Sequence, residues 1–154
     1  LAELRMLLME LRPAALAGPD LGELLSHLAD GTTSRKNLAM RVSVDGRTEL
    51  PVDVKIGLYR IAQEAVSNVV KHACATRVAI ALETQGQAVR LRIEDNGCAR
   101  KALDGLACSP GLGMNIMRER AQSMGGRMQI EQTEEGGTCV LVTWPAGAES
   151  ATDE

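Results

Sequence analysis

Four polar side chains recur at helical spacing within QEAVSNVVKH, residues 63–72. Glu64 and Asn68 are one helical turn apart, and His72 is one turn further, with Lys71 beside it. Residues three and four apart share a helix face. Carboxylate and amide oxygens suit Mg²⁺, and the two basic side chains suit phosphate oxygens. A solvated face of an amphipathic helix has the same pattern, and the stretch alone favours that simpler explanation.

A carboxylate follows a predicted strand in IEDNG, residues 93–97. Asp95 in that position can accept a hydrogen bond from a buried amine, such as the exocyclic amine of adenine. Gly97 lets the backbone turn and lets a planar base come close. A plain Asx turn after a strand explains the same residues.

Two glycine pairs occur at other junctions. In SPGLGM, Gly111 and Gly113 precede a predicted helix, where free backbone N–H groups and the helix dipole can hold phosphate. A hinge or an ordinary helix start is the alternative, and no Gly-Lys-Ser/Thr follows, so the stretch is not a P-loop. Gly136 and Gly137 indicate a hairpin corner, after which Thr138 could still bond a ligand.

The elements that must position these groups follow from hydrophobic periodicity. Leucines at helical spacing begin at the first residue, so we expect the chain to start within a longer helix. The order of elements is not a strict alternation of strand and helix, and it predicts an α/β two-layer sandwich, with a mixed sheet of about five strands packed on three helices. After the opening helix, we expect a helix after the N-cap Asp20, a strand at 38–44, a helix from Pro51 to about Ala73, strands at 77–85 and 87–95, a loop at 96–110, a helix at 111–126, and strands at 127–133 and 138–145.

Composition narrows the classes of function. The 154 residues suit one domain, and one Trp, one Tyr and no Phe predict an aliphatic core. The lack of aromatic side chains argues against stacking on single-stranded nucleic acid, and a net charge of -3 gives no reason to expect nucleic acid as a partner. The four cysteines fit no zinc spacing. We expect reduced thiols in a cytoplasmic domain.

The order of the four motifs along the chain is stronger evidence for a function than any one motif alone. Glu-x-x-x-Asn on a helix, Asp-x-Gly after a strand, Gly-x-Gly before a helix and Gly-Gly-Thr before the last strand resemble the N, G1, G2 and G3 boxes of the GHKL ATPases, whose fold is the Bergerat fold. LYRIAQEAVSNVVKHA and GLGMNIMRERAQSMGG are similar to the catalytic domain of bacterial sensor histidine kinases, in the nitrate/nitrite-sensor branch. LRMLLMELRPAAL resembles the end of that branch's dimerisation helix.

The resemblance implies ATP and Mg²⁺ as ligands and assigns roles by position. Asn68 would bind Mg²⁺ with Glu64 beside it, Lys71 and His72 would contact phosphates, and Asp95 would accept the adenine amine. Glu64 and Asn68 would therefore serve both catalysis and the metal. The implied nucleotide-binding residues are Asn68, Lys71, His72, Asp95, Gly97, Gly111, Leu112, Gly113 and Thr138.

The same resemblance implies transfer of the γ-phosphoryl group of ATP to a histidine on a dimerisation domain, and from there to a response regulator. We expect residues 1–16 to end the dimerisation helix, 17–146 to form the catalytic domain and 147–154 to be a disordered tail. The parent protein would be a homodimer associated with the inner membrane. The stimulus, the cognate regulator, any phosphatase activity and the position of the acceptor histidine in the parent do not follow from the sequence.

Two departures from the family pattern leave alternatives open. Ala99 stands where the first glycine box usually has its second glycine, and alanine at a left-handed position costs about 1 kcal/mol. We therefore expect looser nucleotide binding or a shifted lid. Neither His27 nor His72 fits the acceptor. A degenerate nucleotide-sensing module without kinase activity is one alternative, and another GHKL ATPase or serine kinase is the second.

Overall fold

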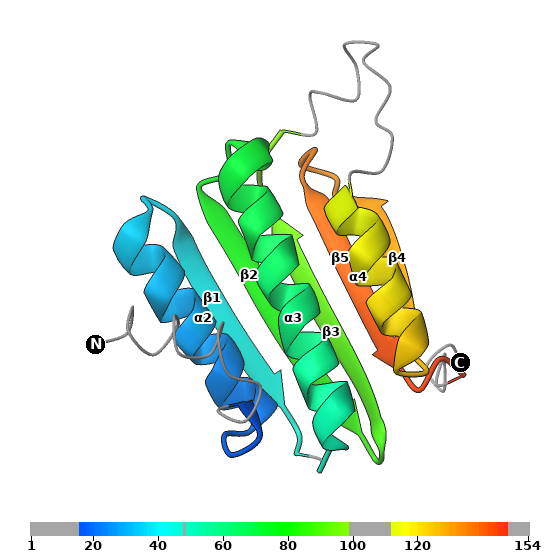
Figure 1. The fold of residues 1–154 in the computed structure, drawn as a ribbon. Coiled ribbons are helices and arrows are strands. Elements are labelled where there is room, and N and C mark those ends of the chain that lie inside the picture. The colour runs from blue at the N-terminus through cyan, green and yellow to red at the C-terminus, as the bar shows by residue number, and fades with distance from the viewer. Residues whose placement is uncertain (1–15, 48, 99–111, 148–154) are drawn as a thin grey trace.

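One mixed sheet of five strands forms one layer of the protein. The structure is a computed structural model, and it describes residues 16–47, 49–98 and 112–147. The strand order is β1-β2-β3-β5-β4 (Figure 1). β1 pairs in parallel with β2, and the other neighbours are antiparallel. The strands are β1 (Ala39–Asp45), β2 (Arg77–Gln85), β3 (Ala88–Asp95), β4 (Arg127–Gln132) and β5 (Thr138–Trp144).

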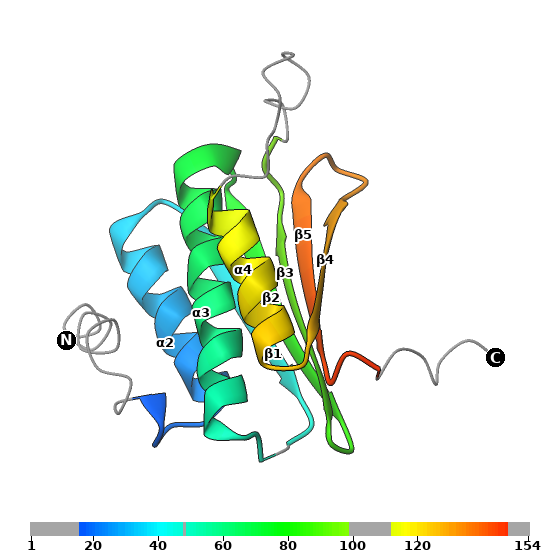
Figure 2. The same cartoon turned by 45° about the vertical axis from the view of Figure 1, so that its right-hand side comes forward.

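Three helical segments cover the same face of this sheet, as Figure 2 shows. They are α2 (Leu21–Arg35), α3 (Val52–Asn68) with its continuation η2 (Val69–Ala73), and α4 (Leu112–Ser123). The expected two-layer α/β arrangement with a mixed sheet is therefore confirmed. The predictions for residues 1–15, 99–111 and 148–154 lie outside the described residues.

The first described helix begins where its capping residues require. Asp20 Oδ1 accepts a hydrogen bond from the Glu23 N–H at 2.8 Å, and the Glu23 carboxylate accepts one from the Asp20 N–H at 3.2 Å. This reciprocal pair is a capping box. It confirms Asp20 as the N-cap.

Aliphatic side chains fill the space between the two layers. Ile80, Leu91 and Ile93 come from the central strands and are almost fully buried. Alternation along the strand predicted at 38–44 places Val44 on the same face as Leu38, but Val44 is 50% exposed whereas Leu38 is buried. It lies near the end of the edge strand β1, beside Gly22 of α2, where an added Cβ would lie 3.1 Å from Val44 Cγ2.

The long helix differs from the prediction in its last turn. The sequence predicts one helix from Pro51 to about Ala73, but the α-helix ends at Asn68 and continues as the π-helix η2. A π turn contains more residues than an α turn.

Candidate functional site

Four segments far apart in the sequence meet at one end of the sheet (Figure 1). They are the end of α3 with η2, the end of β3, the turn between β4 and β5, and the start of α4. The Cys98 N–H donates to the Ala73 carbonyl at 2.9 Å, which joins η2 to the segment after β3. The predicted site residues within the described ranges all lie on these four segments.

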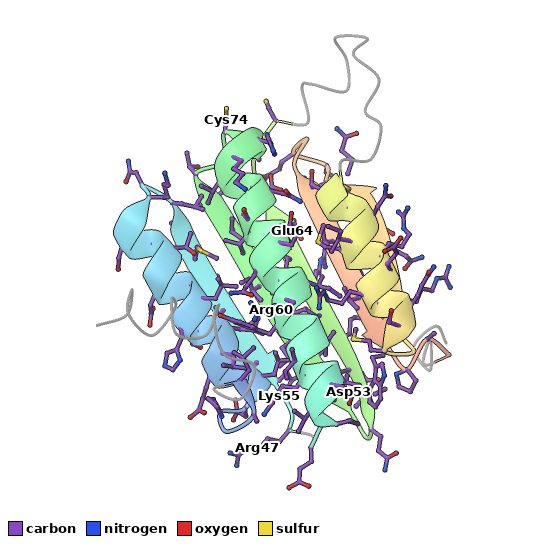
Figure 3. The ribbon with its side chains drawn as sticks, viewed as in Figure 1. Arg47, Asp53, Lys55, Arg60, Glu64 and Cys74 are labelled. Carbon is purple, nitrogen blue, oxygen red and sulfur yellow. The ribbon has the colours of Figure 1, made fainter. Side chains whose placement is uncertain are left out.

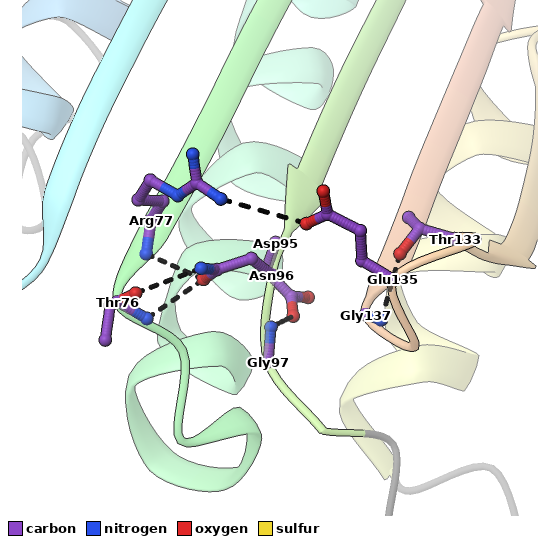
Figure 4. A network of polar contacts seen from close by, with 8 residues as sticks. All are labelled: Thr76, Arg77, Asp95, Asn96, Gly97, Thr133, Glu135 and Gly137. Carbon is purple, nitrogen blue, oxygen red and sulfur yellow. Dashed lines mark hydrogen bonds and ion pairs between the residues drawn. The ribbon is translucent and has the colours of Figure 1, made fainter.

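Asp95 is the buried carboxylate of this region, with 6% of its surface exposed. Successive side chains of a strand point to opposite faces, and Asp95 shares its face with buried Leu91 and Ile93. The carboxylate therefore belongs to the face that the helices cover. Its Oδ1 accepts a hydrogen bond from the Gly97 N–H at 2.8 Å (Figure 4). The Asx turn that the sequence offered as an alternative is thus present.

Burial raises the pKa of the Asp95 carboxyl above its ordinary value of 3.8. The negative charge of Glu94 acts in the same direction, whereas hydrogen bonds from the backbone N–H groups of Gly97 and Thr138 oppose the shift. Desolvation, which penalises the charged form, is the largest of these effects. The site thus contains a carboxylate that gains from a further hydrogen-bond donor.

Gly97 is a glycine because the chain passes too close to η2 for a side chain. A Cβ at residue 97 would overlap the Ala73 carbonyl oxygen and lie 2.7 Å from the Ala73 Cβ. This packing accounts for the glycine without a ligand. The role of Gly97 beside a planar base stays a prediction.

Asn96 is a structural residue that the sequence analysis did not identify. Its Oδ1 accepts hydrogen bonds from the backbone N–H groups of Thr76 and Arg77, at 3.0 and 2.8 Å, and its Nδ2 donates to Thr76 Oγ1 at 2.9 Å (Figure 4). The side chain thereby fixes the end of β3 to the start of β2. Arg77 also forms an exposed ion pair with Glu135, at 3.8 Å.

The turn between β4 and β5 packs against Asp95. Gly136 has φ of +90°, and the Gly137 N–H donates to Thr133 Oγ1 at 2.9 Å. A Cβ on Gly137 would overlap the Asp95 carbonyl oxygen and lie 3.2 Å from the Asn96 Cα. This close approach brings the Thr138 backbone N–H to the Asp95 carboxylate. The predicted hairpin corner is therefore confirmed.

Glu64 and Gly113 join α3 to the first turn of α4. A Cβ on Gly113 would overlap Glu64 Oε1. Figure 3 labels Glu64 and Arg60 on α3. Beside them lies a cavity of about 290 Å³ between the two helices, lined by Arg60, Gln63, Glu64, Ser67, Ile116, Met117 and Arg120.

Three of the remaining predicted residues lie on α3 and its continuation η2. Asn68 is half-buried at the end of α3, and Lys71 and His72 are exposed on η2. Gly111 lies outside the described residues, and the Leu112 side chain is not described. No three His, Cys, Asp or Glu residues gather as a metal cage within the described ranges.

A larger hollow of about 780 Å³ lies on the opposite face of the sheet, where its lining includes Arg41, Arg92 and Glu94. Asp95 and Asn96 border it as well. Alternation along β3 nevertheless directs Arg92 and Glu94 to that open face and Asp95 to the helix side. We therefore place the candidate site on the helix side. Among the described helices, none is both long and apolar enough to span a membrane.

Comparison with known families defines the class of protein. Residues 53–148 match the family described as "Histidine kinase-, DNA gyrase B-, and HSP90-like ATPase". This is more than half of the chain and includes every element of the candidate site. The chain belongs to this family, and membership implies ATP as its nucleotide.

Within the family, the chain is an ATP-binding domain of the histidine kinase type. It is 35% identical over 143 residues to the sensor histidine kinase LiaS of Bacillus subtilis. The aligned region covers 93% of this chain and 39% of LiaS. It is also 35% identical over 150 residues to the sensor protein VraS of Staphylococcus saprophyticus, covering 97% of this chain and 42% of VraS. The chain thus spans about two fifths of the length of these curated relatives. Both resemblances favour the kinase over the sensing module and the serine kinase.

A solved structure supports the fold independently. The blue-light activated histidine kinase of Erythrobacter litoralis EL346 superimposes with a TM-score of 0.63 at 22% sequence identity, over 84% of this chain and 43% of that chain. At this identity the comparison supports the arrangement of sheet and helices. It adds no information on individual site residues.

Proposed function

We propose that this domain binds ATP with Mg²⁺ and presents the γ-phosphoryl group to a histidine of a separate dimerisation domain. The observation that carries the proposal is the burial of Asp95 on the helix side of the sheet, where four segments converge. A buried carboxylate with a raised pKa often has a functional reason for its position, because burial disfavours its charged form. Accepting the exocyclic amine of adenine is such a reason.

The base would be held by three neighbours, from the end of β3, the segment after it and the start of β5. The Asp95 carboxylate would accept the adenine amine while the Gly97 N–H keeps the carboxylate in place. Thr138, whose backbone already contacts Asp95, would bond near the base. Gly97 would leave the flat space that the base requires.

The phosphates would lie toward the helix ends. Lys71 and His72 would contact phosphate oxygens, and the N–H groups of Gly111, Leu112 and Gly113 would bind them at the start of α4. Asn68 would bind Mg²⁺, with Glu64 positioning the metal or a water. Bound Mg²⁺ would neutralise phosphate charge, and phosphoryl transfer depends on such neutralisation and on positioning.

The whole protein would be longer than this chain, as its relatives are. Residues 1–16 would end a dimerisation helix, 17–146 would form the catalytic domain and 147–154 a tail. Two copies of the parent would pair through the dimerisation domain, and the acceptor histidine would lie there. A response regulator would receive the phosphoryl group, and the parent would be anchored to the inner membrane.

Nucleotide titration tests the binding site. We would titrate the chain with ADP and an unhydrolysable ATP analogue, with and without Mg²⁺. We expect the unsubstituted chain to bind, Asp95→Asn to lose the nucleotide, and Asn68→Ala to lose the Mg²⁺ dependence while keeping weak binding. Asp53→Asn, at the far end of α3 in Figure 3, and exposed Gln122→Ala are matched controls that should bind normally. Unchanged binding by Asp95→Asn would refute the assignment.

Autophosphorylation tests the reaction. The full-length parent with radiolabelled ATP should gain acid-labile phosphate on a histidine, and Asp95→Asn should not. A parent that binds ATP but gains no phosphate would instead be the nucleotide-sensing module. Such a result would leave the binding site intact and overturn the proposed transfer.

A further inference from the structure

Two cysteines lie on neighbouring segments at the rim of the candidate site. Cys74 is the residue that follows η2, with φ of 49° in the left-handed conformation, and Cys98 is the third residue after Asp95. Both are exposed free thiols, whereas Cys139 is buried. Figure 3 shows Cys74 at the outer end of the long helix.

One hydrogen bond fixes how far apart the two backbones can be. The Cys98 N–H donates to the carbonyl of Ala73, the residue before Cys74, at 2.9 Å. The planar peptide holds that oxygen about 2.8 Å from the Cys74 α-carbon. The two cysteine α-carbons are therefore within about 7 Å of each other, close to the span of about 4.4–6.8 Å that disulfides bridge.

Contacts on both sides of Cys74 keep its backbone close to that of Cys98. Gly97 lies directly against Ala73 and has no side chain to separate the two segments. Beyond Cys74, the Asn96 side chain binds the backbone N–H of Thr76. Contacts at residues 73 and 76 thus bracket Cys74, and both come from the segment that carries Cys98.

We propose that Cys74 and Cys98 are an oxidisable pair that forms a reversible disulfide. With hydrogen peroxide as oxidant, one thiol gives up its proton and the resulting thiolate attacks the O–O bond, which yields a sulfenic acid. The leaving hydroxide takes up that proton and departs as water. The second thiol then attacks the sulfenic sulfur, which forms the S–S bond and releases a second water. The two thiols lose two electrons and the peroxide gains them. A reducing dithiol reverses the reaction by thiol–disulfide exchange.

The bond would join two segments of the candidate site. His72 lies two residues before Cys74, and Asp95 lies three before Cys98. The cross-link would therefore tie the predicted phosphate contacts of η2 to the predicted adenine contact at the end of β3. The pairing itself depends on the backbone geometry alone and holds whether or not a nucleotide binds.

The sequence allows a direct test by peptide mapping. Trypsin cleaves after Lys and Arg, so each cysteine lies on its own peptide: Cys74 on 72–77, Cys98 on 93–100, Cys108 on 102–118 and Cys139 on 128–154. After mild peroxide treatment and alkylation of the remaining thiols, we expect 72–77 joined to 93–100. The linked species should be two hydrogens lighter than the sum of the peptides and should vanish after treatment with dithiothreitol.

Serine variants provide the controls. Cys74→Ser and Cys98→Ser should each abolish the linked species, and Cys139→Ser should leave it unchanged. Either exposed site accepts serine without disturbing the core. Peptide 93–100 linked to 102–118 instead, or both thiols oxidised with no cross-link, would overturn the proposal. Because the readout is peptide mass, failure here is distinguishable from failure of nucleotide binding, which the reduced protein tests separately.

Discussion

Glu64 and Gly113 touch across the contact between α3 and α4, so closely that a methyl group on residue 113 would overlap Glu64 Oε1. The Glu64 Cγ would lie 3.5 Å from such a methyl group. The absence of a side chain at residue 113 therefore sets where the Glu64 carboxylate can be. Two residues predicted from separate motifs are one structural unit.

Gly113→Ala should separate function from stability. The overlapping atom is the end of a flexible side chain, so Glu64 can move away. Alanine favours a helix by about 1 kcal/mol over glycine, and denaturant unfolding should show equal or higher stability. Displacement of Glu64 should weaken Mg²⁺-dependent nucleotide binding about tenfold, or about 1.4 kcal/mol, as measured by titration. A clear loss of stability would contradict this account.

Gly97→Ala and Gly137→Ala should lower stability, in contrast to Gly113→Ala. Their methyl groups would overlap backbone carbonyl oxygens, of Ala73 and Asp95 respectively, which cannot move independently. We expect each to lower the free energy of unfolding by about 1–3 kcal/mol, as measured by urea denaturation. Gly18→Ala is the matched control, because a Cβ there meets nothing within 4 Å. Unfolding midpoints equal to that of the control would refute the packing argument.

Asn96 should contribute to stability through its side-chain hydrogen bonds. Asn96→Ala removes three exposed side-chain hydrogen bonds, whose partners water can then hydrate. It should cost about 1–2 kcal/mol in unfolding free energy, since a typical bond contributes about 0.5–1.5 kcal/mol net. Asn96→Asp keeps the acceptor and should cost less. Arg77→Ala removes only the exposed ion pair with Glu135 and should change stability by less than about 1 kcal/mol. Equal effects of Asn96→Ala and Arg77→Ala would show that the amide does not anchor β2 to β3.

Local sequence patterns predict the helices and strands. The features that these patterns do not predict depend on long-range packing. The strand alternation, the Asp20 cap and the Gly136 turn depend on neighbouring residues, so the sequence reveals them. The close approach of Gly97 to Ala73 depends on a contact between distant segments. Hydrophobic periodicity does not reveal such a contact. Asn96, a polar residue directly after a predicted strand, was the available signal for the contact with Thr76.

Asp95 should make stability depend on pH in a defined direction. Its folded pKa is raised, mainly by burial, whereas in the unfolded chain it returns to about 3.8. Its contribution to stability is therefore complete below that value and is lost as pH rises through the folded pKa. Relative to Asp95→Asn, the unsubstituted protein should gain unfolding free energy as pH falls through this window. A pH-independent difference between the two urea unfolding curves would contradict the raised pKa.

The same carboxyl should control how nucleoside affinity depends on pH. An ionised carboxylate accepts the adenine amine more strongly than a neutral one, so affinity should fall as pH drops through the raised pKa of Asp95. The fall should begin at a higher pH than an ordinary aspartate would allow. Adenosine is the suitable ligand, because it lacks phosphates that titrate themselves. Asp95→Asn should show no adenosine binding at any pH, and exposed Asp53→Asn should follow the unsubstituted profile. If Asp95→Asn gave the same profile as the unsubstituted protein, the titrating group would have to be another one, and the adenine contact would have to be reassigned.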